Sequence, residues 1–90
     1  MTIERVWERI RAHAGQTFRQ VGGGEFSYEL QSENVIRLNR TTQALSRGVL
    51  EKALARWPVS GPGEFTDLRA PSYLYALLAD PRITGSDGGR

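Results

Sequence analysis

The stretch of residues 71–83, PSYLYALLADPRI, constrains the fold of this 90-residue chain more than any other. It holds the densest group of large apolar side chains in an otherwise polar sequence. Pro71 suits the first turn of a helix, where a backbone N–H would have no partner, and Pro81 ends the helix by disfavouring helical backbone at Asp80. A helix this short is not stable alone. The stretch therefore predicts a helix that closes a packed core.

The composition is that of one small folded domain. Apolar residues make up 39% of the chain, which is ordinary for a globular protein and too high for a disordered one. The absence of cysteine excludes disulfides, thiol catalysis and cysteine-based zinc sites. No apolar run has the length of a membrane span, and the N-terminus has an amphipathic pattern unlike that of a signal peptide. We expect a cytoplasmic protein without membrane association, with one globular domain over residues 1–83 and a disordered tail over residues 84–90.

Hydrophobic periodicity divides the first half of the chain into a helix and three strands. An apolar stripe at helical spacing over residues 2–14 predicts an amphipathic helix, with Thr2 as N-cap and Gly15 as a left-handed stop. Apolar and polar residues then alternate, which predicts strands at residues 17–21, 26–31 and 35–39. The turns between them fall at residues 22–24 and 32–34. Connections this short predict a three-stranded antiparallel meander.

The second half of the chain predicts two helices joined by a long loop. Residues 40–45 are polar and have no clear period. Ser46 has the character of an N-cap for a helix that runs to about Arg56. In the loop that follows, Phe65 and Leu68 are expected to hold the chain against the core. The predicted fold class is α+β, a small single domain in the order α-β-β-β-α-α, with helices covering the three-stranded antiparallel meander.

Positive charge is concentrated between Asn34 and Trp57. The whole chain has 12 basic and 10 acidic residues, and all of the basic residues except Lys52 are arginines. Five basic residues lie in this window against the single acid Glu51, whereas seven basic residues face nine acids in the rest of the chain. Arginine suits phosphate because it makes planar, bidentate contacts. The coding bias of a GC-rich genome is the alternative explanation for so much arginine.

The main candidate site is the predicted strand, loop and helix start within this window. Free backbone N–H groups and the positive end of a helix attract anions, and nearby polar side chains add contacts. The candidate phosphate ligands are Arg37, Asn39, Arg40, Thr41, Thr42, Ser46, Arg47, Lys52 and Arg56. In the structural alternative, Arg37 pairs with Glu29 or Glu33 across the sheet and Ser46 only caps its helix.

A second candidate anion site lies at the start of the last helix. Its residues are Arg69, Ser72 and Tyr73. In the alternative interpretation, Tyr73 and Tyr75 are core aromatics whose hydroxyl groups reach partners at the rim. Asp80 and Arg82 are expected to pair with each other or to cap helix ends.

Little in the sequence favours catalysis. His13 is the only histidine, the acidic residues are scattered, and the glycine triplet joins two strands instead of preceding a helix as a phosphate loop does. We therefore expect no catalytic residues, no metal and no cofactor, and a small enzyme is the least favoured hypothesis.

Two non-enzymatic hypotheses remain. In the first, the chain is a small basic protein that binds nucleic acid, or acts as a regulator, through phosphate contacts from the arginine-rich segment. In the second, it is a protein-interaction module or accessory subunit. Such a module would use a sheet edge, which also allows a homodimer, or an aromatic patch around Trp57, Phe65 and Tyr75.

Overall fold

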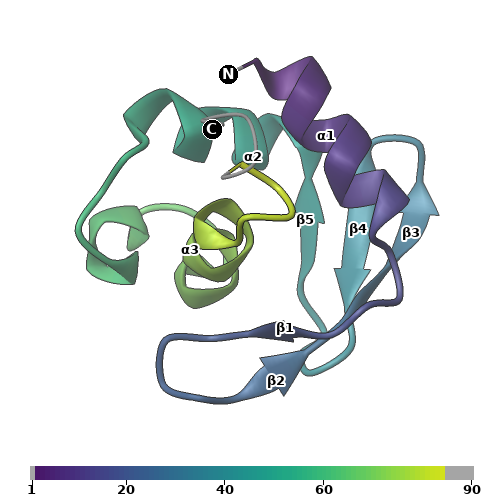
Figure 1. Cartoon of the computed structure of the whole chain (residues 1–90), viewed down its shortest axis with the longest axis horizontal. Helices are drawn as coiled ribbons and strands as arrows, with labels where there is room; N and C mark the ends of the chain where they lie inside the picture. Colours follow the sequence, from purple (N-terminus) through teal and green to yellow (C-terminus); the bar gives the residue numbers. More distant parts are fainter. Residues whose placement is uncertain (1, 85–90) are drawn as a thin grey trace.

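Three α-helices and two antiparallel sheets make up the computed structural model, which describes residues 2–84 (Figure 1). The helices are α1 (Ile3–Ala12), α2 (Arg47–Arg56) and α3 (Pro71–Ala79), with a short 3₁₀ helix, η1 (Pro62–Phe65), before α3. The strands are β1 (Phe18–Arg19), β2 (Glu25–Phe26), β3 (Tyr28–Ser32), β4 (Val35–Leu38) and β5 (Ala44–Ser46). The predicted α+β class is confirmed. Of the predicted tail, Thr84 lies in the turn after α3, and residues 85–90 lie outside the described residues.

The predicted three-stranded meander exists, but it is formed by β3, β4 and β5. The strand predicted at residues 26–31 is divided at Ser27. Phe26 pairs with Phe18 in the two-stranded sheet β1–β2, and the residues from Tyr28 onward join the meander. The sequence pattern does not show this change of sheet at Ser27. Apolar and polar residues alternate with a period of two on both sides of Ser27 without interruption.

The third strand of the meander lies in the segment predicted to be irregular. β5 has three residues, and only the middle one, Leu45, is fully buried. It pairs with Ile36 of β4. One inward side chain is too few to produce a detectable alternation, so the strand was missed. Conversely, the first predicted strand, residues 17–21, shortens to the two residues of β1.

The helices begin and end close to the residues that the capping, proline and glycine signals predicted. The hydroxyl group of Thr2 accepts a hydrogen bond from a first-turn N–H of α1 at 3.3 Å, and that of Ser46 does the same for α2 at 3.2 Å. Pro71 is the first residue of α3, and Gly15, after α1, has a φ of 89°. These ends are therefore set by short-range sequence.

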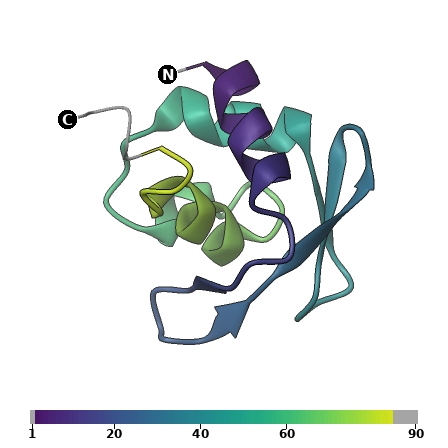
Figure 2. The same ribbon diagram turned by 45° about the vertical axis from the view of Figure 1, so that its right-hand side comes forward.

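The helices gather on one side of the meander, and α3 lies above the β1–β2 hairpin (Figures 1 and 2). α3 contributes Leu74, Leu77 and Leu78 to the core, all fully buried. Phe65 of η1 is also fully buried, as predicted, and holds the loop after α2 against the core. Tyr28 is buried with its hydroxyl group donating to the carbonyl of Ile10 at 2.6 Å, and burial raises the pKa of this phenol.

Candidate functional site

The nine candidate phosphate ligands do not converge on one site. β5 pairs antiparallel to β4, with Val35 opposite Ser46 and Arg37 opposite Ala44. The loop of residues 39–43 therefore lies at one end of the meander, and the start of α2 lies at the other (Figure 1). β5 therefore separates the two parts of the arginine-rich segment, although they are continuous in sequence. The sequence did not predict this strand.

Six of these nine side chains make hydrogen bonds within the fold. At the loop end, Asn39 accepts from the N–H of Ser27 at 2.8 Å, and Arg40 donates to the carbonyl of Glu25 at 2.7 Å. Thr41 accepts a hydrogen bond from the Gln43 N–H, and Ser46 caps α2. Arg47 lies 3.5 Å from a Glu4 carboxylate oxygen, and Arg56 donates to Asp67. These six groups have structural partners, and the capping role that the structural alternative gave to Ser46 is confirmed.

Arg56 has the most complete partnership of the nine. Its two terminal nitrogens donate to the two carboxylate oxygens of Asp67 at 2.7 and 2.6 Å, and one of them also donates to the carbonyl of Glu64 at 3.1 Å. The hydrogen bonds from Arg56 lower the pKa of Asp67 from 3.8 to about 2. The pair ties the loop after α2 to the end of that helix.

We expect the carboxyl group of Asp67 to titrate near pH 2, and the variant Arg56→Gln to return its pKa to about 3.8. The pair stabilises the fold above about pH 4, and this contribution disappears as the pH falls through the folded-state pKa. Carbon-13 NMR of the carboxyl carbons measures both values. Glu64 is the control, because hydrogen bonds from Ser60, not from Arg56, lower its pKa. A value near 3.8 for Asp67 in the unmodified protein would contradict the pairing.

The side chains of the other three candidates have no hydrogen bond or ion pair with any other residue of the part that the structure describes. Thr42 and Lys52 are exposed on the loop and on α2. Arg37 is exposed on β4 directly opposite Glu29 of β3, the partner that the structural alternative named. The outer face of the meander thus presents a basic and an acidic side chain together.

The second candidate site also has structural roles. The hydroxyl group of Ser72 accepts a hydrogen bond from the amide of Gln20 at 3.0 Å. Tyr73 packs edge-on against Phe26, with ring centroids 4.9 Å apart, which confirms the interpretation of Tyr73 as an aromatic packed on the core. Arg69 is exposed beside them.

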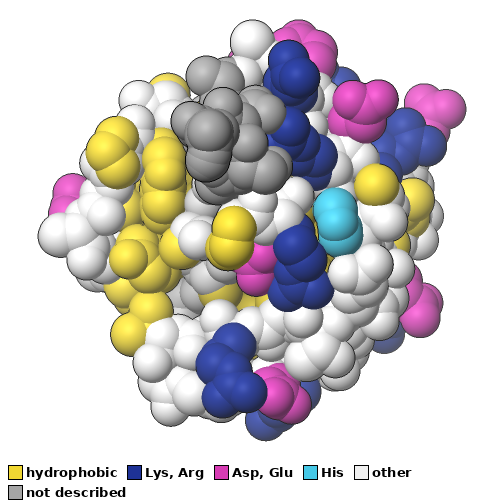
Figure 3. All heavy atoms as spheres, in the orientation of Figure 1, with side chains coloured by type: hydrophobic (Ala, Val, Ile, Leu, Met, Phe, Trp, Pro, Cys, Tyr) yellow, Lys and Arg dark blue, Asp and Glu magenta, His cyan; other side chains and the backbone are white. Residues whose placement is uncertain are grey.

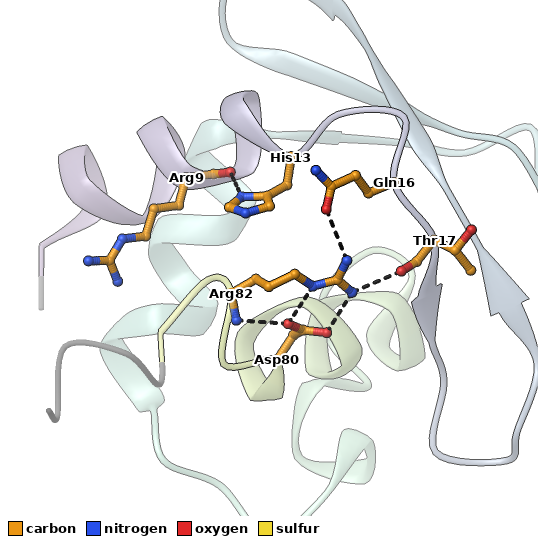
Figure 4. A network of polar contacts seen from close by, with 6 residues as sticks. All are labelled: Arg9, His13, Gln16, Thr17, Asp80 and Arg82. Atoms are coloured by element: carbon orange, nitrogen blue, oxygen red, sulfur yellow. Dashed lines mark hydrogen bonds and ion pairs between the residues drawn. The ribbon is translucent and has the colours of Figure 1, made fainter. Parts of the chain in front are cut away.

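A polar network around Arg82 holds the turn after α3 against the segment between α1 and β1 (Figure 4). Arg82 donates to both carboxylate oxygens of Asp80, at 3.0 and 2.9 Å, to the amide oxygen of Gln16 at 3.1 Å and to the carbonyl of Thr17 at 2.8 Å. Its guanidinium carbon lies 3.9 Å from the ring centroid of Phe18. The predicted pairing of Asp80 with Arg82 is confirmed.

The pKa of Asp80 reflects its hydrogen bonds with Arg82 inside the fold. Burial raises the pKa of Asp80, but the hydrogen bonds from Arg82 outweigh it and hold the pKa below the ordinary 3.8. Beside the pair, a ring nitrogen of His13 lies 2.8 Å from the carbonyl of Arg9 (Figure 4). The Arg9 side chain donates to the carbonyl of Ile83 at 3.2 Å. With so many partners inside the chain, Arg82 and Asp80 stabilise the fold.

A partly apolar surface lies where the β1–β2 hairpin meets α3. Val21, at the end of the β1–β2 hairpin, is 66% exposed. It lines a groove of about 250 Å³ together with the apolar residues Tyr75, Ala76, Ala79 and Pro81 and the polar residues Arg19, Gln20 and Asp80. The ring of Tyr75 lies 5.5 Å from that of Trp57, so the groove continues into the predicted aromatic patch. We call this surface the apolar band: Val21, Trp57, Tyr75, Ala79 and Pro81.

The apolar band joins segments that are far apart in sequence. In Figure 3, hydrophobic side chains gather along the left side, over α3 and the loop after α2. Trp57 and Tyr75 of the predicted aromatic patch lie within it. Phe65 does not, because it is fully buried in the core and stacks on Trp57 from there, with ring centroids 6.5 Å apart. The sequence marked these aromatics but gave no signal that Val21 lies beside them, because the hairpin meets α3 only in the folded chain.

The two tryptophans differ in exposure and in hydrogen bonding. Trp7 is 2% exposed, and its indole N–H donates to the carbonyl of Glu33 at 2.9 Å. Trp57 is half-buried, and among residues 2–84 its indole N–H has no acceptor. A half-exposed tryptophan with a free N–H is well suited to meet a partner that offers both apolar contact and a carbonyl.

Within residues 2–84 the structure gives no indication of a metal site, a buried charged site or a membrane-spanning helix. No charged side chain in this range is buried, and no three residues of the metal-ligating types His, Asp and Glu cluster there. None of its helices has the length and apolar character needed to span a membrane. Comparisons of the chain with protein-family models, with curated proteins and with solved structures give no match.

Proposed function

We propose that this protein is a non-enzymatic protein-interaction module whose partner docks on the apolar band. The observation that carries the proposal is the exposure of Val21, 66%, beside the groove that Tyr75, Ala79 and Pro81 line. A contiguous apolar surface of this kind on a small domain typically marks an interaction site. The cytoplasmic location expected from the sequence stays a prediction.

The composition of the apolar band favours a protein partner. Aromatic side chains, tryptophan and tyrosine above all, contribute most to the affinity of protein interfaces. Trp57 and Tyr75 stand half-buried with their rings in contact range, so little side-chain freedom is lost when a partner covers them. The free indole N–H of Trp57 adds one directional contact.

The charges next to the apolar band are already compensated within the chain. Arg19 pairs with Glu25 at 2.9 Å, and Asp80 pairs with Arg82 at 2.9 Å. A partner that docks on the apolar band therefore contacts apolar side chains and ion pairs without net charge, instead of an excess of positive or negative charge. We infer that its binding depends weakly on salt, unlike binding to a phosphate backbone.

Nucleic-acid binding is the second candidate function. The observation that favours it is that Arg37 and Lys52 are exposed and have no ion pair within the described residues, in a chain of net charge +2. With Arg40 they can approach phosphates without breaking an internal ion pair. Apart from Thr42, the other candidate ligands of the arginine-rich segment would have to exchange structural partners for phosphate, which weakens this candidate.

One co-purification experiment separates the two functions. The band variant carries Val21→Glu and Ala79→Glu, and the matched basic variant carries Arg37→Glu and Lys52→Glu, all at exposed positions. From the native cells we expect one stoichiometric protein with the unmodified chain and with the basic variant. We expect at least a roughly tenfold loss of it with the band variant, because an unpaired carboxylate is costly to bury in an apolar interface.

Mass spectrometry of the bound protein and absorbance of bound nucleic acid are measured together, with circular dichroism as the check that each variant is folded. The proposal fails if the band variant keeps its protein partner in full. If nucleic acid elutes with the unmodified chain and is lost only from the basic variant, the second candidate function replaces the first.

A further inference from the structure

The groove beside Val21 has the edge of a β-strand as one of its walls. Three consecutive residues of the β1–β2 hairpin, Arg19, Gln20 and Val21, line this wall. The opposite wall is formed by the second half of α3 and the turn after it, with Tyr75 and Ala79 among its residues. β1 lies between β2 and α3 (Figures 1 and 2), so the groove follows the side of β1 that β2 does not cover.

The main chain of Arg19 faces this open side of β1. Successive residues of an antiparallel strand direct their N–H and C=O groups to alternate sides. The N–H of Gln20 donates to the carbonyl of Gly24 at 2.7 Å, inside the hairpin, so the groups of Arg19, opposite Glu25, point away from β2. Within residues 2–84 neither group has a hydrogen-bond partner. An unpaired edge of this kind is a template for one more strand.

The charges around this edge match an uncharged occupant. The two charged residues that line the groove are Arg19 and Asp80, and each has an ion pair of 2.9 Å, with Glu25 and with Arg82. The edge therefore offers main-chain hydrogen bonds without an excess of either charge. Val21, 66% exposed, adds an apolar contact next to the free main-chain groups.

We propose that an extended, uncharged segment of the partner protein adds to β1 as a third strand of the β1–β2 sheet. Its main chain pairs with the N–H and C=O of Arg19, and an apolar side chain enters the groove against Val21 and Tyr75. The inference rests on the proposed function, because it names the form in which the partner meets the apolar band.

Two other occupants fit the edge less well. A helix satisfies its main-chain groups internally and leaves those of Arg19 unpaired. A second copy of the chain, paired about a two-fold axis at Arg19, places the two Arg19 side chains opposite each other, and like charges at opposite positions destabilise a strand pair. A strand from a different protein meets neither obstacle.

Hydrogen exchange of the Arg19 N–H, followed by NMR on the full chain, tests the proposal. The probe is a short uncharged peptide of alternating valine and threonine, capped at both ends. The matched control peptide carries N-methyl groups on its central residues, which removes main-chain donors and keeps the side chains. At saturation we expect the probe to slow exchange of the Arg19 N–H at least about tenfold and the control to leave it unchanged.

Two variants at one position assign the binding to the edge of β1. Arg19→Pro removes the N–H that faces the groove, and an edge strand tolerates proline where the N–H is not part of the ladder. We expect it to weaken the probe at least about fivefold, the loss of one hydrogen bond. Arg19→Gln removes the charge but keeps the N–H, and its affinity is expected to stay within about twofold. Fluorescence anisotropy measures both affinities, and circular dichroism checks folding.

Three results would overturn the proposal. The first is an Arg19 N–H that exchanges at the same rate with the probe at about 1 mM, the weak end of specific affinities. The second is equal affinity for the probe and the N-methylated peptide. The third is protection of the Arg19 N–H that rises with protein concentration in the absence of peptide, which would make a second copy the occupant.

Co-purification from the native cells separates this inference from the proposed function. A partner that is lost from the band variant and kept by folded Arg19→Pro leaves the proposed function standing and overturns strand addition. A partner that both variants keep overturns both. We expect both variants to lose it and Arg19→Gln to keep it.

Discussion

We expect Leu77→Ala to lower the free energy of unfolding by about 2 to 5 kcal/mol. Leu77 is fully buried on α3, the helix that closes the core, and it belongs to the cluster of buried apolar side chains, so its truncation leaves a cavity in a close-packed interior. A domain of this size has a total stability of roughly 5 to 10 kcal/mol, so the loss is a large fraction of the whole. Urea denaturation followed by circular dichroism measures it.

Leu30→Ala is the matched control for this prediction. It removes the same atoms from a side chain that is 41% exposed, so we expect a cost below about 1 kcal/mol. Equal losses in the two variants would mean that α3 does not close the core. A much smaller loss in Leu77→Ala than in Leu30→Ala would contradict the packing altogether.

We expect Arg82→Met to cost about 2 kcal/mol, the second-largest effect. The change removes donors to Asp80, Gln16 and Thr17. The side chain of Arg82 is 35% exposed, which places the cost toward the lower end of the range for charged hydrogen bonds. Arg82→Lys is expected to recover less than half of the loss, because an ammonium group cannot reproduce the planar fork.

The pH dependence of stability distinguishes this network from simple packing. The folded-state pKa of Asp80 lies below 3.8, so its pairing stabilises the fold above about pH 4, and the contribution is lost as the pH falls below that value. In Arg82→Met this part of the acid sensitivity is expected to shrink. Arg69→Met, at an exposed position, is the control and should stay within about 0.5 kcal/mol of the unmodified protein at every pH. An Arg82→Met variant as stable as the unmodified protein would contradict the network.

Sequence patterns predicted the elements that depend on short-range signals. Thr2, Ser46 and Pro71 mark helix starts through local hydrogen bonds and a fixed φ, and all three helices begin where these residues predicted. Local sequence signals did not predict the parts of the fold that depend on which strands pair. Nothing local at Ser27 shows that the chain leaves one sheet and enters another, and nothing local shows that Leu45 lies on a strand.

The candidate site was harder to predict for the same reason. The arginine-rich segment is dense in sequence, but β5 sends its two parts to opposite ends of the meander, and partners from distant segments occupy several of its side chains. Asp67 lies eleven residues beyond Arg56, and Glu4 lies far from Arg47 in sequence. The apolar band was only partly predictable, because Val21 meets α3 through tertiary packing and not through any pattern of spacing.

The central claim is that a protein partner docks on the apolar band, and site-specific photocrosslinking in the native cells tests it most directly. A benzophenone amino acid replaces Val21 in one strain, Ala79 in a second and Arg37, on the outer face of the meander, in a third. We predict one protein adduct of the same mass at Val21 and Ala79 and none at Arg37. An adduct at Arg37 alone, or no protein adduct at Val21, would contradict the claim.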